Sequence, residues 1–351
     1  MSTQPDRGGD TVLMSTSVVS RGFNISYRAE GRGAPLVLLH GGSMWADTWW
    51  DAGYADELVN DYRVIAIDFL GHGHSDKSYD PADYHGDLVV SDIVAVLDAE
   101  RVERALVWGY SMGATHAALL AVRRPDRVAA VVFGGEAPLP APEGRREWLA
   151  SRAEAVRTSE GMAAFFREMG TPDDVVATYV AANDPAAFSA VMAAGANEQR
   201  TDAADVQAPS LWYQGTEDAP FTRESLEIAA RCGVETHLIG GADHAAAFNR
   251  ANEALAFVRP FLEQHRPSAA AREASANASK QRRRTGKEPP QGSPRGAAGR
   301  HAYRLRLSTV PAEQYGITYS LGHPPEIVRP SLGPSTVGVV GPIVFAGSGS
   351  P

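Results

Sequence analysis

The sequence predicts an α/β fold: a mostly parallel central sheet of about eight strands flanked by helices, with a helical insertion after the sixth strand. Three observations support this prediction. Short apolar runs alternate with longer amphipathic stretches, as expected when helices connect parallel strands. Apolar residues make up 44% of the 351 residues, enough for a large core. The stretch 137–206 carries helical patterns and no strand pattern.

The expected elements follow from the spacing of apolar residues. Strand patterns fall near 12–20, 22–28, 35–40, 63–68, 104–109, 128–134, 209–214 and 234–239. Helical patterns fall near 46–59, 84–99, 112–123 and 247–264, and shorter ones within the insertion at 145–156, 161–169, 172–182 and 185–194. Only a short turn separates the first two strands, so we expect them to form an antiparallel edge of the sheet.

These patterns divide the chain into five segments. They are an N-terminal segment at 1–11, expected to be disordered, two parts of one core at 12–136 and 207–265, the helical insertion at 137–206, and a tail at 266–351. The tail carries 12 Lys and Arg against 4 Asp and Glu, whereas the residues before it carry 21 against 38. We expect the tail to be mostly disordered, because its composition buries too little apolar surface to offset chain entropy.

Composition and spacing argue against several other classes of protein. The basic tail lacks interleaved aromatic residues and a nucleic-acid-binding motif, so no nucleic-acid partner is expected. No run approaches about eighteen apolar residues and the first residues are polar, so we expect neither a membrane span nor a secretory signal. A single cysteine, Cys232, fits a cytoplasmic location. No metal site is expected, because C-x-x-C and H-E-x-x-H spacings are lacking, and the sequence leaves the oligomeric state open.

The most informative motif is G-Y-S-M-G at residues 109–113, between a strand pattern and a helical pattern. A serine on such a turn takes strained backbone angles that hold its hydroxyl clear of the sheet. Glycines flank it because a side chain would collide with the neighbouring elements. We therefore predict that Ser111 is a catalytic nucleophile; the alternative is a tight structural turn.

Other motifs follow in a familiar order. They are LVLLHGGS at 36–43, a D-x-x-G-x-G-x-S turn within 64–76, GTED at 215–218 and GADH at 241–244. Together with the serine motif they resemble the α/β-hydrolase fold family over about residues 18–265. The resemblance implies an oxyanion loop after the third strand, an acid loop after the seventh and a histidine loop after the eighth. It also implies that the helical insertion is a cap that roofs the active site.

The predicted catalytic triad is Ser111, His244 and Asp218. His244 follows the last strand, and loops at the carboxyl ends of parallel strands share one edge of the sheet, so it can meet Ser111 there. Asp218 follows the seventh strand, and the order Ser, Asp, His is typical of this fold. Glu136 after the sixth strand is an alternative acid, and Glu217 is a second one.

Two backbone N–H groups are the expected oxyanion hole. Met112 supplies one as the residue after the nucleophile, and the resemblance implies Gly42 for the other. Trp45 and Trp49 follow the oxyanion loop closely. They either pack a helix or form an aromatic wall of the substrate pocket, and tryptophan serves both uses.

The predicted function is hydrolysis of a carboxylic ester or related acyl bond through an acyl-Ser111 intermediate. The expected partner is a small-molecule ester or acyl substrate, and no cofactor is implied. The resemblance leaves open lactone hydrolysis, carbon–carbon bond hydrolysis, acyl transfer and perhydrolysis on the same triad. A small-molecule binding protein or receptor on a hydrolase fold is the alternative from another class, because fold alone does not determine function.

Overall fold

The computed structural model describes residues 16–136, 145–168, 171, 173–197, 201, 203–218, 226–227, 229, 231–232 and 234–267. The predicted N-terminal segment 1–11 lies outside the described residues, as does the predicted tail after Pro267. Arg266 is described, and its guanidinium lies 4.3 Å from the ring centre of Tyr62 while its Nε donates to the Tyr62 hydroxyl at 3.1 Å. The packed part of the chain therefore continues past the predicted boundary at 265.

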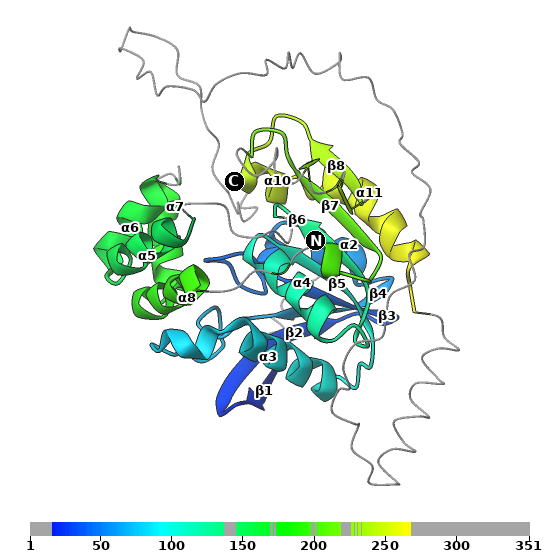
Figure 1. Ribbon diagram of the computed structural model, residues 1–351, viewed down its shortest axis with the longest axis horizontal. Coiled ribbons are helices and arrows are strands. Elements are labelled where there is room, and N and C mark those ends of the chain that lie inside the picture. Colours follow the sequence, from blue (N-terminus) through cyan, green and yellow to red (C-terminus); the bar gives the residue numbers. More distant parts are fainter. Residues whose placement is uncertain are drawn as a thin grey trace, which may run out of the picture. The chain divides into compact units, whose positions relative to one another are not determined.

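Eight strands form one mostly parallel sheet, as predicted (Figure 1). They are β1 (Thr16–Ser20), β2 (Phe23–Glu30), β3 (Ala34–Leu39), β4 (Tyr62–Ile67), β5 (Ala105–Tyr110), β6 (Val128–Gly134), β7 (Ser210–Gly215) and β8 (Glu235–Ile239). Their order is β1-β2-β4-β3-β5-β6-β7-β8. β1 pairs antiparallel with β2, and β2 with β4, which confirms the antiparallel edge. The other neighbours pair in parallel.

The helices connect these strands. They are α1 (Thr48–Asp51), α2 (Tyr54–Leu58), η1 (Pro81–Tyr84), α3 (Gly86–Ala99), α4 (Met112–Arg123), α5 (Arg145–Ala155), α6 (Ser159–Glu168), α7 (Asp173–Ala182), α8 (Pro185–Asn197), η2 (Ala203–Asp205), α10 (His244–Asn249) and α11 (Ala251–Gln264). The single helix predicted at 46–59 is two short helices, because Gly53 between them takes a left-handed φ of 83°. The helix predicted at 247–264 likewise divides at Arg250.

The central strands are buried on both faces, and alternate residues face different helices. In β3, Val37 and Leu39 pack in a cluster with α3 and α4, whereas Leu36 and Leu38 pack in a second cluster with α2 and α11. This alternation explains why β3 is apolar at every position. The helical layers hold the carboxyl ends of the strands in fixed positions, and the site is built at these ends.

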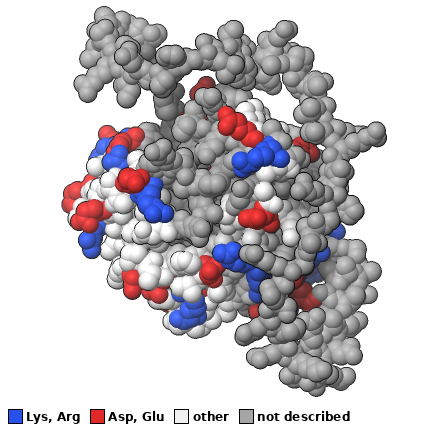
Figure 2. Space-filling model, in the orientation of Figure 1, with Lys and Arg blue, Asp and Glu red and all other residues white. Residues whose placement is uncertain are grey.

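Helices α5–α8, called the inserted helices below, lie between β6 and β7 in the chain, where the sequence predicts an insertion. They have a small apolar core of their own, which includes Phe165, Phe166, Tyr179 and Phe188. Figure 2 shows acidic and basic side chains interspersed over these helices. The charges pair in part, as between Arg167 and Asp173 at 2.6 Å.

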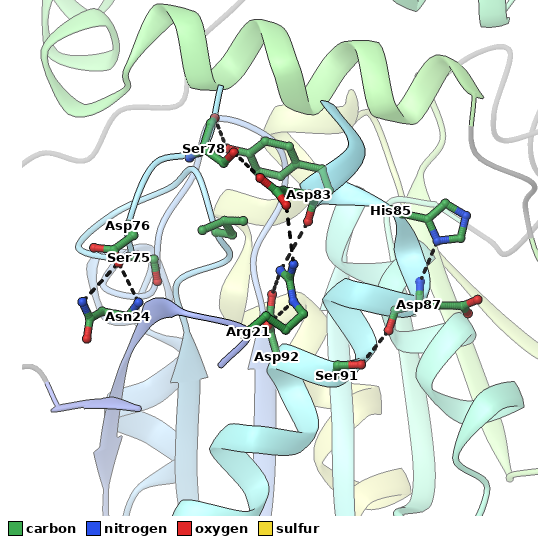
Figure 3. Close-up of polar contacts among 12 residues, drawn as sticks. Arg21, Asn24, Ser75, Asp76, Ser78, Asp83, His85, Asp87, Ser91 and Asp92 are labelled. Carbon is green, nitrogen blue, oxygen red and sulfur yellow. Dashed lines mark hydrogen bonds and ion pairs between the residues drawn. The ribbon is translucent and has the colours of Figure 1, made fainter. Parts of the chain in front are cut away.

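Polar contacts attach the antiparallel edge to the rest of the fold (Figure 3). Arg21 lies in the β1–β2 turn, and its Nε and Nη2 donate to the Asp92 carboxylate in α3 at 3.0 and 2.7 Å. Asp76 accepts from the backbone N–H of Asn24 in β2 at 2.7 Å, so the loop after β4 is tied to the same edge. In the same view α8 runs above the loop that contains Ser78.

Candidate active site

Ser111 lies on the turn between β5 and α4, with φ 53° and ψ −118°. A non-glycine residue rarely takes a positive φ, and such strain persists only where the surroundings hold it. Here the Ser111 N–H donates to the carbonyl of Gly134 at 2.8 Å. A Cβ on Gly109 would lie 2.2 Å from the Gly113 carbonyl oxygen, and a Cβ on Gly113 would lie 2.1 Å from that of Leu39. Both glycines are therefore required by close backbone approaches.

His244 and Asp218 form a hydrogen bond, although 26 positions separate them. His244 Nδ1 lies 2.8 Å from Asp218 Oδ2. The Asp218 side chain is 4% exposed and that of His244 is 40% exposed. A carboxylate in this position favours the tautomer with the proton on Nδ1, which leaves Nε2 able to accept a proton.

The loops that carry these two residues are hydrogen-bonded to each other. Thr216 N–H donates to the Ile239 carbonyl at 3.1 Å, and Glu217 N–H to the Ala242 carbonyl at 2.9 Å. Asp243 caps α10 by accepting from the N–H of Ala246 at 2.7 Å, so His244 is the first residue of a capped helix. The relative position of the acid and histidine loops therefore depends on backbone contacts.

Tyr110 and Gly135 connect Ser111 with His244. The Tyr110 hydroxyl donates to the His244 carbonyl oxygen at 2.5 Å, and the two rings lie 5.4 Å apart. A Cβ on Gly135 would lie 3.1 Å from Cε1 of His244. Ser111 directly follows Tyr110, and its N–H bonds to the carbonyl of Gly134, the residue before Gly135. Tyr110 and the end of β6 therefore contact both Ser111 and His244. Sequence reasoning missed the Tyr110 contact, because its partner is 134 positions away and no local pattern marks it.

The loop after β3 passes beside Ser111. A Cβ on Gly41 would lie 3.4 Å from that of Ser111. The Gly41 carbonyl accepts from His40 Nδ1 at 2.7 Å and from Met44 N–H at 3.3 Å. Because the N–H and C=O of a trans peptide point in opposite directions, these bonds turn the Gly42 N–H away from His40. Met112 begins α4, where an N–H has no intrahelical acceptor.

Two histidines near this loop are buried. His40 is fully buried, its Nε2 accepts from Phe69 N–H at 3.2 Å, and burial holds its pKa well below the ordinary value. Burial also lowers the pKa of His72 to about 4. Both are neutral near pH 7, so they support the loops as uncharged groups.

The comparisons with known proteins agree with the fold. The family model described as "alpha/beta hydrolase fold" matches residues 34–172. The chain has the α/β-hydrolase fold. Among curated relatives, the 2-hydroxymuconate semialdehyde hydrolase of Pseudomonas sp. (strain CF600) is 37% identical over 122 residues, which are 34% of this chain and 42% of that protein. The chain spans less than half the length of the curated relatives it matches.

Solved structures share the fold of this α/β-hydrolase-fold chain. The enol-lactonase from Burkholderia xenovorans LB400 is 24% identical with a TM-score of 0.60, and the match covers 71% of this chain and 98% of that one. A structure of carboxylesterases from the thaumarchaeon Nitrososphaera gargenis is 20% identical with a TM-score of 0.61, covering 71% and 98%. At these identities the likeness shows the fold alone.

The remaining predicted residues of this α/β-hydrolase-fold protein occupy different surroundings. Trp49 is fully buried, and its ring centre lies 5.4 Å from that of Trp108 and 5.2 Å from that of Phe248. This position favours helix packing for Trp49. Trp45 is partly buried and lies 6.4 Å from the ring of Tyr179 in α7, so it borders the inserted helices.

The alternative acids differ from Asp218 in burial and position. Glu136 is 6% exposed and follows β6, as the sequence predicts for an acid at that strand. Glu217 is exposed. Among the described residues, no group of three or more His, Cys, Asp and Glu could hold a metal ion. Within that same part of the chain, no helix is long and apolar enough to cross a membrane.

Proposed function

We propose that the chain is a serine hydrolase that cleaves a carboxylic ester or related acyl bond through an acyl-Ser111 intermediate. The 2.8 Å hydrogen bond between His244 and Asp218 carries this proposal. It pairs a potential base with a buried carboxylate, beside the strained turn that presents Ser111. The family, and relatives named as hydrolases, support hydrolysis as the reaction class.

The proposed reaction has two halves. In the first, His244 Nε2 takes the Ser111 proton as the hydroxyl attacks the acyl carbon, and then gives it to the departing alcohol. In the second, His244 removes a proton from water as the water attacks the acyl carbon, and then gives that proton to Ser111 Oγ as the bond to the acyl carbon breaks and the acid is released. Asp218 keeps the imidazole in the required tautomer and stabilises the imidazolium.

The oxyanion of each tetrahedral intermediate would be bound by the backbone N–H groups of Gly42 and Met112. These donors are set before the reaction, so they need no reorganisation as charge develops. The inserted helices are proposed to act as the cap over this site and to set the choice of substrate. Trp45, beside Tyr179 of α7, is the proposed aromatic residue of the pocket.

A second candidate is hydrolysis of a carbon–carbon bond beside a ketone. The observation that favours it is the relative named 2-hydroxymuconate semialdehyde hydrolase, whose named substrate contains no ester bond. The same triad could serve both reactions, since each needs a nucleophile, a base and an oxyanion hole.

A substrate panel with a Ser111→Ala control tests both candidates. The panel comprises para-nitrophenyl acetate, a γ-lactone and a β-diketone, and Ser111→Ala should lose several orders of magnitude in turnover on any compound that wild type hydrolyses. Faster turnover of the diketone than of the ester would favour the second candidate. One slow burst that leaves the protein acylated would indicate a receptor, and near wild-type turnover by Ser111→Ala would contradict the proposal.

A further inference from the structure

A buried amide connects the inserted helices with the oxyanion loop. Asn183, between α7 and α8, is 7% exposed. Its Nδ2 donates to the Ser43 carbonyl at 3.1 Å and to the Tyr179 carbonyl at 3.0 Å. A side-chain amide has two N–H donors, so both are used and the amide can hold only one orientation here.

Ser43 takes a conformation that needs such support. Its φ is 61°, in the left-handed region that non-glycine residues rarely occupy. Its hydroxyl donates to the Gly42 carbonyl at 2.5 Å, and its own carbonyl accepts from Asn183. Without Asn183, the Ser43 carbonyl would lose this hydrogen-bond partner, which is 140 positions away in the chain and lies between α7 and α8 of the inserted helices.

The loop is therefore held on both sides of Gly42. On one side, His40 Nδ1 and Met44 N–H fix the Gly41 carbonyl, and on the other side Asn183 fixes the Ser43 carbonyl. The Gly42 N–H lies in the same peptide plane as the Gly41 carbonyl. Because glycine has wide conformational freedom, this plane keeps its direction only if the loop is held on both sides of Gly42. A Cβ on Gly42 would meet nothing within 4 Å, so packing around Gly42 does not provide this restraint.

We propose that Asn183 is a positioning residue, which holds the oxyanion loop so that the Gly42 N–H faces the developing oxyanion. The inference rests on the proposed function, because Gly42 has this role only if Ser111 is the nucleophile. Asn183 contacts no reacting atom itself. It makes the geometry of the oxyanion hole depend on the corner between α7 and α8.

A neighbouring contact ties the same corner to the core. The Tyr79 hydroxyl lies 3.3 Å from Oδ2 of Asp184, the residue after Asn183, and Asp184 Oδ1 accepts from Ala187 N–H at 2.9 Å. Figure 3 shows the Ser78 loop, which precedes Tyr79, directly beside α8. The corner is thus attached to two loops of the core, and the Asn183 hydrogen bond is the attachment that reaches the oxyanion loop.

The test compares Asn183→Leu with the matched control Ser189→Ala. Leu has a similar volume without donors, whereas Ser189 is 8% exposed and donates at 2.6 Å to the Ala153 carbonyl within the inserted helices. Active sites are counted with a fluorophosphonate, and para-nitrophenyl acetate turnover is expressed per active site. Removing a whole oxyanion donor lowers kcat by about 10²–10³-fold, so loosening one should lower it by about tenfold, with KM within about twofold of wild type.

Inhibition by trifluoroacetone gives the decisive second readout, because this ketone forms an oxyanion-bearing adduct with a serine nucleophile. Its Ki should rise by about the same factor as kcat/KM falls. A structural role alone would lower the number of active sites and leave Ki unchanged. If Asn183→Leu fails to fold, Asn183→Ser is used, since it keeps a polar group that is too short to reach Ser43.

The outcomes separate the inference from the function on which it rests. If Ser111→Ala is inactive and Asn183 variants match Ser189→Ala in kcat and Ki, the positioning role is wrong and the proposed function stands. If Ser111→Ala retains wild-type turnover, both are wrong.

Discussion

Replacing Asp218 by asparagine keeps the shape of the side chain and removes its charge. The new amide would donate to His244 Nδ1 and so favour the proton on Nε2, where the ring can no longer accept the Ser111 proton. The attraction between a carboxylate and an imidazolium at the observed 2.8 Å is about 6 kcal/mol for an effective dielectric constant near 20. The His244 side chain is 40% exposed, so water screens part of this energy and the figure is an upper bound.

The same change in a serine protease triad costs about 10⁴ in kcat, or about 5.4 kcal/mol, which agrees with this bound. We therefore expect Asp218→Asn to lower kcat for para-nitrophenyl acetate by about 10³–10⁴-fold. Turnover is measured per active site, with thermal unfolding to show that the fold is intact. The matched control is Glu136→Gln, since Glu136 is 6% exposed and Asp218 is 5% exposed. A larger loss in Glu136→Gln would refute the reasoning and place the acid after β6.

Three further predictions concern the turn, a buried histidine and the substrate pocket. Gly113→Ala should lower the free energy of unfolding in urea by about 1–3 kcal/mol or more, because the new Cβ would lie 2.1 Å from a backbone oxygen. The control Gly240→Ala should cost less than about 1 kcal/mol, because a Cβ there would meet nothing within 4 Å. His72 has its pKa lowered from 6.5 to about 4, so the unfolded chain binds its proton at a higher pH than the folded protein does. Stability should therefore fall as the pH falls from about 6.5 to 4, by up to roughly 1.4 kcal/mol per pH unit from this group. Urea unfolding of His72→Gln at several pH values should show a smaller slope of stability against pH than wild type, and an unchanged slope would contradict this. Among para-nitrophenyl esters from acetate to dodecanoate, kcat/KM should peak at short acyl chains, because the alanine-rich inserted helices offer little apolar wall; a profile still rising at dodecanoate would contradict this.

Local patterns were sufficient to predict much of the fold. The G-Y-S-M-G turn, the alternation of strands and helices, and the helices of the insertion all depend on residues near one another in the chain, so spacing alone indicates them. Chain order also placed Asp218 and His244 in loops that the structure shows to be hydrogen-bonded.

Contacts between distant segments were not predictable in the same way. The strand order, the packing of Trp49 against Trp108 and Phe248, and the hydrogen bond of Tyr110 to the His244 carbonyl arise from tertiary packing. Asn183 is the clearest example, because an asparagine between two helices is an ordinary sequence feature. Its contact with Ser43 becomes visible only when the two segments lie side by side.

Trapping the covalent intermediate tests the central proposal most directly. Wild-type protein is mixed with para-nitrophenyl acetate, quenched in acid during turnover, digested and analysed by mass spectrometry. We predict an acetyl group on Ser111, in the peptide that contains Gly109–Gly113, and none in the corresponding peptide of Ser111→Ala, which should also lose turnover. An acetyl group that forms on another residue at the rate of turnover, with undiminished activity in Ser111→Ala, would contradict the account.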